Sequence, residues 1–322
     1  MSRVLVTGAT GFVGGVLCPV LIRAGYDVIA HVRKQGHPNT PEGVTPSVVP
    51  DIGPDTDWTA ALGGVEAVVH LAARVHVMKE KAGGALAKFN RTNADGTASL
   101  AAAAAAAGVR RFVYLSTVKV MGETSAQPFR ESDTPHPEDA YGKSKLAGEK
   151  ALIEAAEPSG METVILRPPL VYGPGAKGNV LSLLKFCRLA PPLPFSAVDN
   201  RRSLIHVGNL ADAILLCLDR KEATGQTYFV RDGEDLSTPD LIRRLAAALG
   251  RPARFFPVPE GFLRLAGRIT GKDPEVDRAL GNLQINDDKI RRELGWTPPV
   301  NVVQGLNETA SWFATEKTAQ KR

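Results

Sequence analysis

The first fourteen residues constrain the fold of this chain more than any other segment. A short apolar run, Val4–Val6, leads into a turn whose glycines, Gly8, Gly11 and Gly14, stand three residues apart, and a helical pattern follows. Glycine at these places allows a tight turn, close approach of a ligand to the backbone, and packing of the helix on the strand. Because the first amides of a helix are unpaired and carry partial positive charge, the segment predicts a pyrophosphate site, although an ordinary strand-to-helix turn can look similar.

Short apolar runs alternate with helical stretches through the first half of the chain, which is typical of a doubly wound parallel α/β sheet. The runs are Val4–Val6, Val28–Val32, Val65–Leu71, Phe112–Leu115 and Val164–Leu166, and the helical stretches are Phe12–Ala24, Ala85–Ala107 and Tyr141–Ala156. After Pro168 prolines and glycines multiply and the elements become shorter. We therefore predict a Rossmann domain over residues 1–170, with a return segment near 204–220, and a smaller, mainly substrate-binding domain over 171–322.

Composition and charge exclude several classes of function. The chain has 322 residues, 43% of them hydrophobic, which is enough for a large core with a smaller companion. Its formal net charge of +5 suits an anionic ligand, but the basic residues are dispersed, so we expect no nucleic-acid partner. Cys18, Cys187 and Cys217 lie far apart among apolar residues and match neither a metal site nor a disulfide framework.

The position of the first strand and the length of the apolar runs bear on location. The strand begins at the third residue, which leaves no room for a signal peptide, and no apolar run is long enough to span a membrane. We therefore expect a cytoplasmic protein with no membrane partner.

Tyr141 and Lys145 stand four residues apart in a stretch of helical character, so both side chains project from one face. A phenol is a poor acid or base at neutral pH, because its usual pKa is about 10. A nearby ammonium favours the phenolate, so Lys145 could lower the pKa of Tyr141, and it could also hold ribose hydroxyls. An aromatic residue and a lysine also coincide on helices without any catalytic role.

Six motifs occur together in a fixed order. They are TGxxGxxG at Gly8, Gly11 and Gly14, HLAA at 70–73, LST at 115–117, YxxxK at Tyr141 and Lys145, LRPPLVYGPG at 166–175 and RSLIHV at 202–207. With them the chain resembles, over nearly its full length, the extended short-chain dehydrogenase/reductases, specifically the nucleotide-sugar epimerase/dehydratase family. The joint occurrence of the motifs favours function over coincidence at each one.

The resemblance implies roles for individual residues. Tyr141 would exchange a proton with a sugar hydroxyl, Lys145 would adjust its pKa, and Thr117 would hydrogen-bond the reacting oxygen. Lys119, Asn179 and Arg202, together with Thr117, would bind the nucleotide-sugar, where an arginine suits the diphosphate. The residues that would line the coenzyme are Gly8, Thr10, Gly11, Phe12, Val13, Gly14, Arg33, Asp51, Ile52, Leu71, Ala72, Ala73, Asn93, Ser116, Tyr141, Lys145 and Pro168. No metal ligand is expected.

Two positions depart from the family pattern. Members that prefer NAD often end the second strand with an aspartate, which accepts hydrogen bonds from the ribose 2′-hydroxyl. Here Val32 is followed by Arg33 and Lys34, so a 2′-phosphate would meet no carboxylate and NADP(H) is favoured, with NAD(H) possible. An exposed loop charge is the other interpretation of Arg33. Leu170 replaces an asparagine that many 4-epimerases place near the substrate.

Lys119, the pair Pro168-Pro169 and Arg33 look similar to bacterial reductases that act on UDP-4-keto-6-deoxy-hexosamines for surface polysaccharides. The sequence therefore predicts such a reductase, with UDP-glucose or UDP-N-acetylglucosamine 4-epimerase as the alternative. A 4,6-dehydratase is disfavoured, because Val118 and Lys119 stand where those enzymes place acidic residues. A dinucleotide sensor without turnover is disfavoured because the residues expected to be catalytic are all present.

The expected partner molecules are a UDP-sugar and a second copy of the chain. Members of the family usually pair through two helices of each subunit. We expect the helices that hold Ala101–Ala107 and Tyr141–Ala156 to form a homodimer. The alanine run would then pack either on the sheet of its own subunit or on the partner.

Overall fold

The apolar runs of the first half become neighbouring strands of one sheet in the computed structural model, which describes residues 2–75, 84–271 and 273–319. The strands of this sheet are β1 (Arg3–Thr7), β2 (Asp27–Val32), β3 (Thr45–Val48), β4 (Ala67–His70), β5 (Arg111–Leu115), β6 (Glu162–Arg167) and β10 (Gln226–Phe229). They lie in the order β10-β6-β5-β4-β1-β2-β3, and every neighbouring pair is parallel. The predicted doubly wound parallel sheet is thereby confirmed. Its strand order reverses between β1 and β4, where ligands of such sheets bind.

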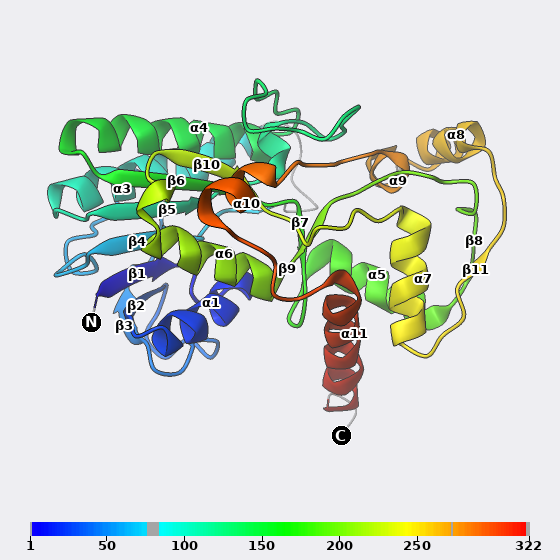
Figure 1. Ribbon diagram of the computed structural model, residues 1–322, viewed down its shortest axis with the longest axis horizontal. Coiled ribbons are helices and arrows are strands. Elements are labelled where there is room, and N and C mark those ends of the chain that lie inside the picture. The colour runs from blue at the N-terminus through cyan, green and yellow to red at the C-terminus, as the bar shows by residue number, and fades with distance from the viewer. Residues whose placement is uncertain (1, 76–83, 272, 320–322) are drawn as a thin grey trace.

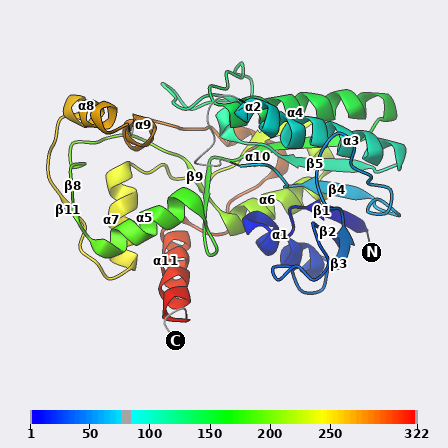
Figure 2. The same ribbon diagram turned by 180° about the vertical axis from the view of Figure 1, so that it is seen from behind.

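Helices cover both faces of the sheet (Figures 1 and 2). α1 (Phe12–Arg23) and α6 (Val207–Asp219) lie on one face, and α2 (Ala85–Asn90), α3 (Gly96–Ala106) and α4 (Ala140–Ala156) on the other. A hydrophobic core lies on each face of the sheet. Successive side chains of β1 point to opposite faces, so Val4 and Val6 pack in the core on the α1 side and Leu5 packs in the core on the α3 side. Within the alanine run, Ala101 and Ala104 are buried in that second core, so the run packs on its own sheet.

Three details differ from the sequence expectation. β3 was not among the predicted runs, because it is short, contains Pro46 and is largely exposed. The helix expected over Ala85–Ala107 is interrupted by a π-helical turn, Arg91–Asp95. Such turns insert one extra residue and often serve a site, and here the turn carries the buried Asn93. The strand expected over Val65–Leu71 is regular only from Ala67 to His70.

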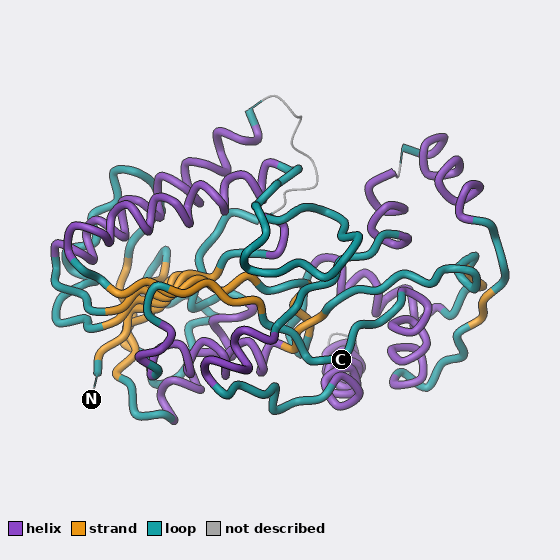
Figure 3. The backbone as a smooth tube through the Cα atoms, turned by 45° about the horizontal axis from the view of Figure 1, so that its top comes forward, coloured by secondary structure: helices purple, strands orange, loops and turns teal. Residues whose placement is uncertain are grey.

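The remaining elements form a smaller part beyond the carboxyl edge of the sheet (Figure 3). It contains two small parallel sheets, β7 (Leu170–Tyr172) with β9 (Leu204–His206) and β8 (Pro192–Leu193) with β11 (Arg254–Phe255). Its helices are α5 (Gly178–Leu189), α7 (Thr238–Ala248), α8 (Glu260–Thr270), α9 (Asp273–Leu280) and α11 (Val302–Ala319). Short helical turns are η2 (Val118–Val120), η3 (Glu157–Ser159) and η4 (Lys221–Ala223).

Three elements that follow residue 170 in sequence lie against the first part. α6 packs on α1, β10 extends the main sheet beside β6, and α10 (Asp288–Leu294) contacts β10. Among the described residues, no helix combines the length and the apolar character that crossing a membrane requires.

Candidate functional site

The glycine turn after β1 has the conformation that the sequence predicts. Gly8 has a φ of +72°, and a Cβ added there would lie 2.9 Å from the backbone nitrogen of Ala72. A Cβ on Gly14 would lie 2.3 Å from the carbonyl oxygen of Gly8, so α1 can approach the turn only with glycine at that position. Gly11 caps α1 without a side chain, which leaves the first amides of the helix available to an anion. These features fit a pyrophosphate; Thr10 lies in the same turn, and Phe12 and Val13 begin α1.

A buried hydrogen-bond chain fixes the backbone after β4 beside this turn. The Ala72 amide donates to Thr7 Oγ1 at 3.1 Å, and Thr7 Oγ1 lies 2.6 Å from His70 Nδ1. His70 Nε2 lies 3.1 Å from Thr97 Oγ1, which donates to the Asn93 carbonyl at 2.8 Å. Burial holds the pKa of His70 well below its ordinary value, so the ring is neutral, and the donor order places its proton on Nε2. Leu71, Ala72 and Ala73 are thereby held against the glycine turn.

Both the oxygen and the nitrogen of the Asn93 side-chain amide make hydrogen bonds, which join the loop after Ala73 to α4. Its Oδ1 accepts from the Arg74 amide at 2.8 Å, and its Nδ2 donates to the Arg74 carbonyl and to Ser144 Oγ, both at 3.0 Å. Only 1% of the residue is exposed. Asn93 therefore ties the loop after Ala73 to α4.

The predicted catalytic pair lies in the first turns of α4. Asp139 caps this helix, accepting from the Gly142 amide at 2.6 Å. Tyr141 is half-buried, and its ring meets that of Phe89 edge-on at 6.2 Å between centroids. Lys145, one turn later, is 1% exposed, and its Nζ lies 3.9 Å from the centroid of the Tyr114 ring. The two side chains project from the same face of the helix.

The pKa values of this pair differ from the sequence expectation. Burial, helped by the charge of Asp139, raises the pKa of Tyr141 above its ordinary value. Burial also lowers the pKa of Lys145 to about 7, with Glu149 opposing the change. The expected lowering of the Tyr141 pKa by Lys145 is therefore not found, because the buried lysine is itself only partly protonated near neutral pH.

The loop after β5 carries Ser116 and Thr117 toward α4. The Ser116 amide donates to the Leu166 carbonyl at 2.7 Å, and the Val118 amide donates to the Pro168 carbonyl at 2.9 Å. The Ser116 hydroxyl donates to Glu149. Thr117, 9% exposed, caps η2 and accepts from the Lys119 amide at 3.3 Å.

Glu149 and Arg167 form a buried ion pair beneath this loop. Arg167 Nη2 lies 2.6 Å from Glu149 Oε2, and Arg167 Nε lies 3.0 Å from Glu149 Oε1. Sequence reasoning missed this pair, although Glu149 follows Lys145 by one helical turn on the face of α4 that carries Tyr141 and Lys145. The ion pair fixes Ser116, and with it Thr117, relative to Lys145.

Lys119 is held by two carboxylates that sequence reasoning did not connect with it. Its Nζ lies 2.6 Å from Glu123 Oε1 and 2.7 Å from Asp139 Oδ2. Burial opposes the charge of Lys119, but the two carboxylates raise its pKa overall. Asp139 could have been found from its place just before a predicted helix, where aspartate is a favoured cap.

The residues predicted for the nucleotide-sugar come from both parts of the molecule. Arg202 is half-buried, and its Nη1 donates to the Gly281 carbonyl at 3.0 Å. Burial lowers the pKa of Arg202, while the charge of Glu123 raises it, so Arg202 faces the same region as Lys119. Asn179 is exposed in the first turn of α5.

The residues predicted for the far end of the coenzyme lie at the β2 and β3 side of the sheet. β2 ends at Val32, and Arg33 and Lys34 follow it as exposed residues. A hollow of about 430 Å³ is lined by residues that include Asp51 and Arg91, whose charged groups lie 4.0 Å apart. Ile52 is buried.

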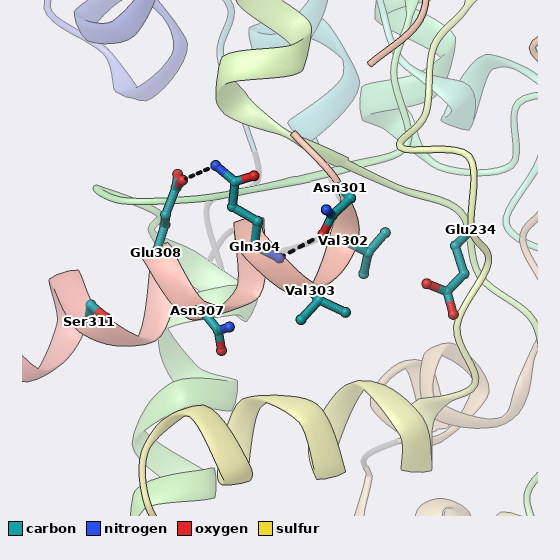
Figure 4. Close-up of a pocket in the computed structure, with 8 residues that line it drawn as sticks. All are labelled: Glu234, Asn301, Val302, Val303, Gln304, Asn307, Glu308 and Ser311. Carbon is teal, nitrogen blue, oxygen red and sulfur yellow. Dashed lines mark hydrogen bonds between the residues drawn. The ribbon is translucent and has the colours of Figure 1, made fainter. Parts of the chain in front are cut away.

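A second hollow, of about 690 Å³, lies along α11 and is lined by none of the predicted site residues. Figure 4 shows its polar wall, with a hydrogen bond from Gln304 to Glu308 and one from the Gln304 amide to Asn301. Its other lining residues are Glu234, Val302, Val303, Asn307 and Ser311.

Known proteins resemble this chain over most of its length. The sequence profile of the NAD dependent epimerase/dehydratase family matches residues 4–230. UDP-glucose 4-epimerase from Vibrio cholerae is 41% identical over 316 residues, covering 97% of this chain and 95% of the relative. 2-Alkyl-3-oxoalkanoate reductase from Stenotrophomonas maltophilia is 27% identical over 336 residues, covering 94% and 97%.

The fold is shared with solved structures. UDP-glucuronic acid 4-epimerase from Bacillus cereus, in complex with NAD, matches with a TM-score of 0.78 and 22% identity, covering 97% of this chain and 99% of that one. The resemblance stated from the motifs is therefore confirmed. The chain belongs to the NAD dependent epimerase/dehydratase family.

Proposed function

We propose that this enzyme transfers a hydride between a nicotinamide coenzyme and C4 of a UDP-sugar. The observation that carries the proposal is the placement of Tyr141 and the buried Lys145 on one face of α4, with Thr117 on the adjoining loop. The glycine turn and the uncapped start of α1 fit the coenzyme pyrophosphate. The 41% identical relative, a UDP-glucose 4-epimerase, supports a UDP-sugar as substrate.

In this proposal, side chains of the protein transfer the proton at C4 and orient the substrate. The nicotinamide, when bound, supplies or accepts the hydride. Tyr141 exchanges a proton with the C4 oxygen, and Thr117 hydrogen-bonds the same oxygen. Lys145 has a pKa of about 7, so a ribose hydroxyl that accepts from its ammonium favours the charged form, which then lowers the pKa of Tyr141. In this proposal Arg202 and Asn179 bind the diphosphate of the UDP-sugar, and Lys119 contacts the sugar.

The residues at the end of β2 favour net reduction of a 4-keto sugar. Arg33 and Lys34 are exposed there, and no carboxylate ends the strand, which suits the 2′-phosphate of NADPH. An epimerase regenerates its coenzyme in each turnover and gains nothing from a reduced NADPH pool, whereas a reductase does. We therefore propose UDP-4-keto-6-deoxy-hexosamine reduction as the direction of the reaction.

4-Epimerisation is the second candidate, because the Vibrio cholerae relative carries that activity in its name. Both reactions share the same half-reaction at C4, but only the reductase consumes reduced coenzyme. One assay therefore separates them. The protein is mixed with a freshly generated UDP-4-keto-6-deoxy-hexosamine and NADPH, and separately with UDP-glucose or UDP-N-acetylglucosamine without added coenzyme. Stoichiometric loss of absorbance at about 340 nm supports the reductase. C4 epimers formed without added coenzyme support the epimerase. If neither result is observed, the proposal of hydride transfer at C4 of a UDP-sugar is contradicted.

Arg33 provides the test of coenzyme preference. We expect Arg33→Glu to weaken NADPH binding by about tenfold or more, because one charge-assisted hydrogen bond contributes about 1.5–3 kcal/mol. NADH binding should change much less, because NADH has no 2′-phosphate. Binding is measured by titration of the reduced coenzyme fluorescence, with Arg23→Glu, an exposed arginine at the end of α1, as the charge-matched control. An equal loss for both coenzymes would contradict this role of Arg33.

We also propose a homodimer through α3 and α4. The outer side of α4 exposes Ile153 to 51%, and the two helices pack side by side. Paired helices of this kind bury apolar surface in symmetric dimers.

A further inference from the structure

We propose that the end of the molecule opposite the sheet, formed by α8, β8, β11 and the end of α5, binds an anionic membrane surface. These elements lie at one end of the long axis, with α8 at one side of that end, the end of α5 at the other, and β8 and β11 between them (Figures 1 and 2). The proposal does not depend on the proposed reaction.

Exposed apolar side chains concentrate at this end. Of the twelve large hydrophobic residues that the described chain exposes, six lie here: Phe186, Leu189, Phe256, Phe262, Leu265 and Ile269. They belong to three separate segments of sequence. A single exposed hydrophobic residue needs no explanation, but half of those that the described chain exposes lie at this end, three of them on α8, which indicates an interaction surface.

α8 has the pattern of a helix that lies in a membrane interface. Phe262, Leu265 and Ile269 are 67%, 52% and 77% exposed, and their i, i+3, i+7 spacing places them on one face. The opposite side packs on α9, because a Cβ on the buried Gly267 would lie 2.9 Å from Val276 Cγ2. The contact with α9 therefore holds the helix while its apolar face points outward.

The charge of this end complements an anionic surface. Residues 183–193 and 250–271 contain one acidic residue, Glu260, and six basic ones: Lys185, Arg188, Arg251, Arg254, Arg264 and Arg268. This surplus equals the formal net charge of the whole chain, +5, although the sequence of α9, which packs on α8, contains the acidic residues Asp273, Glu275 and Asp277. Asp277 of α9 pairs with Arg264 at 2.7 Å. Arginines beside an exposed apolar helix face favour anionic headgroups.

A membrane explains this surface better than a folded partner does. The apolar side chains are divided among three segments and interspersed with arginines, whereas the core of a protein interface is depleted of charge. The proposal revises the expectation of no membrane partner, which was based on the lack of a spanning segment. A helix that lies in the interface needs no spanning length.

The test is co-sedimentation of the full chain with vesicles of phosphatidylcholine alone or with about 30% phosphatidylglycerol. We expect binding only to the anionic vesicles, reduced at least fivefold by about 0.5 M salt. Phe262→Ser/Leu265→Ser/Ile269→Ser should lose binding at least tenfold, and Arg254→Gln/Arg268→Gln at least threefold. All substituted side chains are exposed, so the fold should persist, as circular dichroism can verify.

Matched controls remove similar groups elsewhere. Val48→Ser/Val303→Ser removes two exposed apolar side chains, and Arg23→Gln/Lys150→Gln removes two exposed charges. Both variants should bind as the wild type does. The proposal is overturned if the wild type does not bind anionic vesicles at low salt, or if Phe262→Ser/Leu265→Ser/Ile269→Ser binds them as the wild type does. It is also overturned if sedimentation velocity shows that the α8 substitutions break a dimer, since this end would then be an interface between two chains.

Discussion

Replacing Tyr141 by phenylalanine should lower turnover by about 10²–10⁴-fold, which is the usual contribution of a positioned proton donor or acceptor. The substitution removes one oxygen atom and keeps the ring, which meets Phe89 at 6.2 Å between centroids. In the proposed reduction, hydride transfer to C4 would then leave a developing alkoxide without its proton source. Coenzyme binding should change little, because the glycine turn lies on a different element. Turnover is followed at about 340 nm and coenzyme affinity by fluorescence titration.

Tyr26→Phe is the matched control. Its hydroxyl donates to Asp219 near the amino end of β2, away from the site, so turnover should stay at the wild-type level. Retention of wild-type turnover in Tyr141→Phe would contradict the proton role. If the wild-type protein binds coenzyme but turns over no UDP-sugar, while Tyr141→Phe behaves identically, the dinucleotide sensor becomes the better interpretation.

The fold was predictable because its determinants are local. Val4–Val6, the spaced glycines and the helical pattern after them encode a strand, a turn and a helix within a few residues of one another. The same holds for Tyr141 and Lys145, since helical spacing alone places both on one face. The smaller part was harder, because its strands have two or three residues and pair across long separations, as β8 does with β11. Such strands carry too few residues to show a period.

The groups that position the site could be predicted only in part. Asp139 precedes a helix and has the pattern of a cap, but its bond to Lys119 depends on where the loop after β5 lies. Glu149 and Arg167 meet across 18 residues in a buried pair, which no local pattern indicates. Asn93, in the π-helical turn, hydrogen-bonds Arg74 and Ser144, which are distant from it in sequence. The direction of the pKa shifts also required the burial of each group to be known.

Lys145→Met should raise stability and abolish turnover in the same protein. The folded pKa of Lys145 is about 7 and its ordinary value is 10.5. The folded protein therefore binds fewer protons than the unfolded chain between these values, and the cost of burying the ammonium is largest below pH 7 and fades toward pH 10.5. Methionine fills similar space without charge, so the coenzyme-free variant should be more stable by up to roughly 5 kcal/mol near pH 6.5.

Urea unfolding at pH 6.5 and 9.5 measures the effect. The stability gain of Lys145→Met should be about 3 kcal/mol smaller at pH 9.5. At that pH the lysine is neutral in the folded protein, and removing the proton that it carries in the unfolded chain costs little because the pH is close to 10.5. Lys143→Met, an exposed lysine on the same helix, should show no such gain at either pH. A variant less stable than the wild type at pH 6.5, or a gain independent of pH, would mean that the ammonium is well solvated or paired in the ligand-free protein. A fall in turnover together with a rise in stability would show that the burial of Lys145 serves the site and opposes folding.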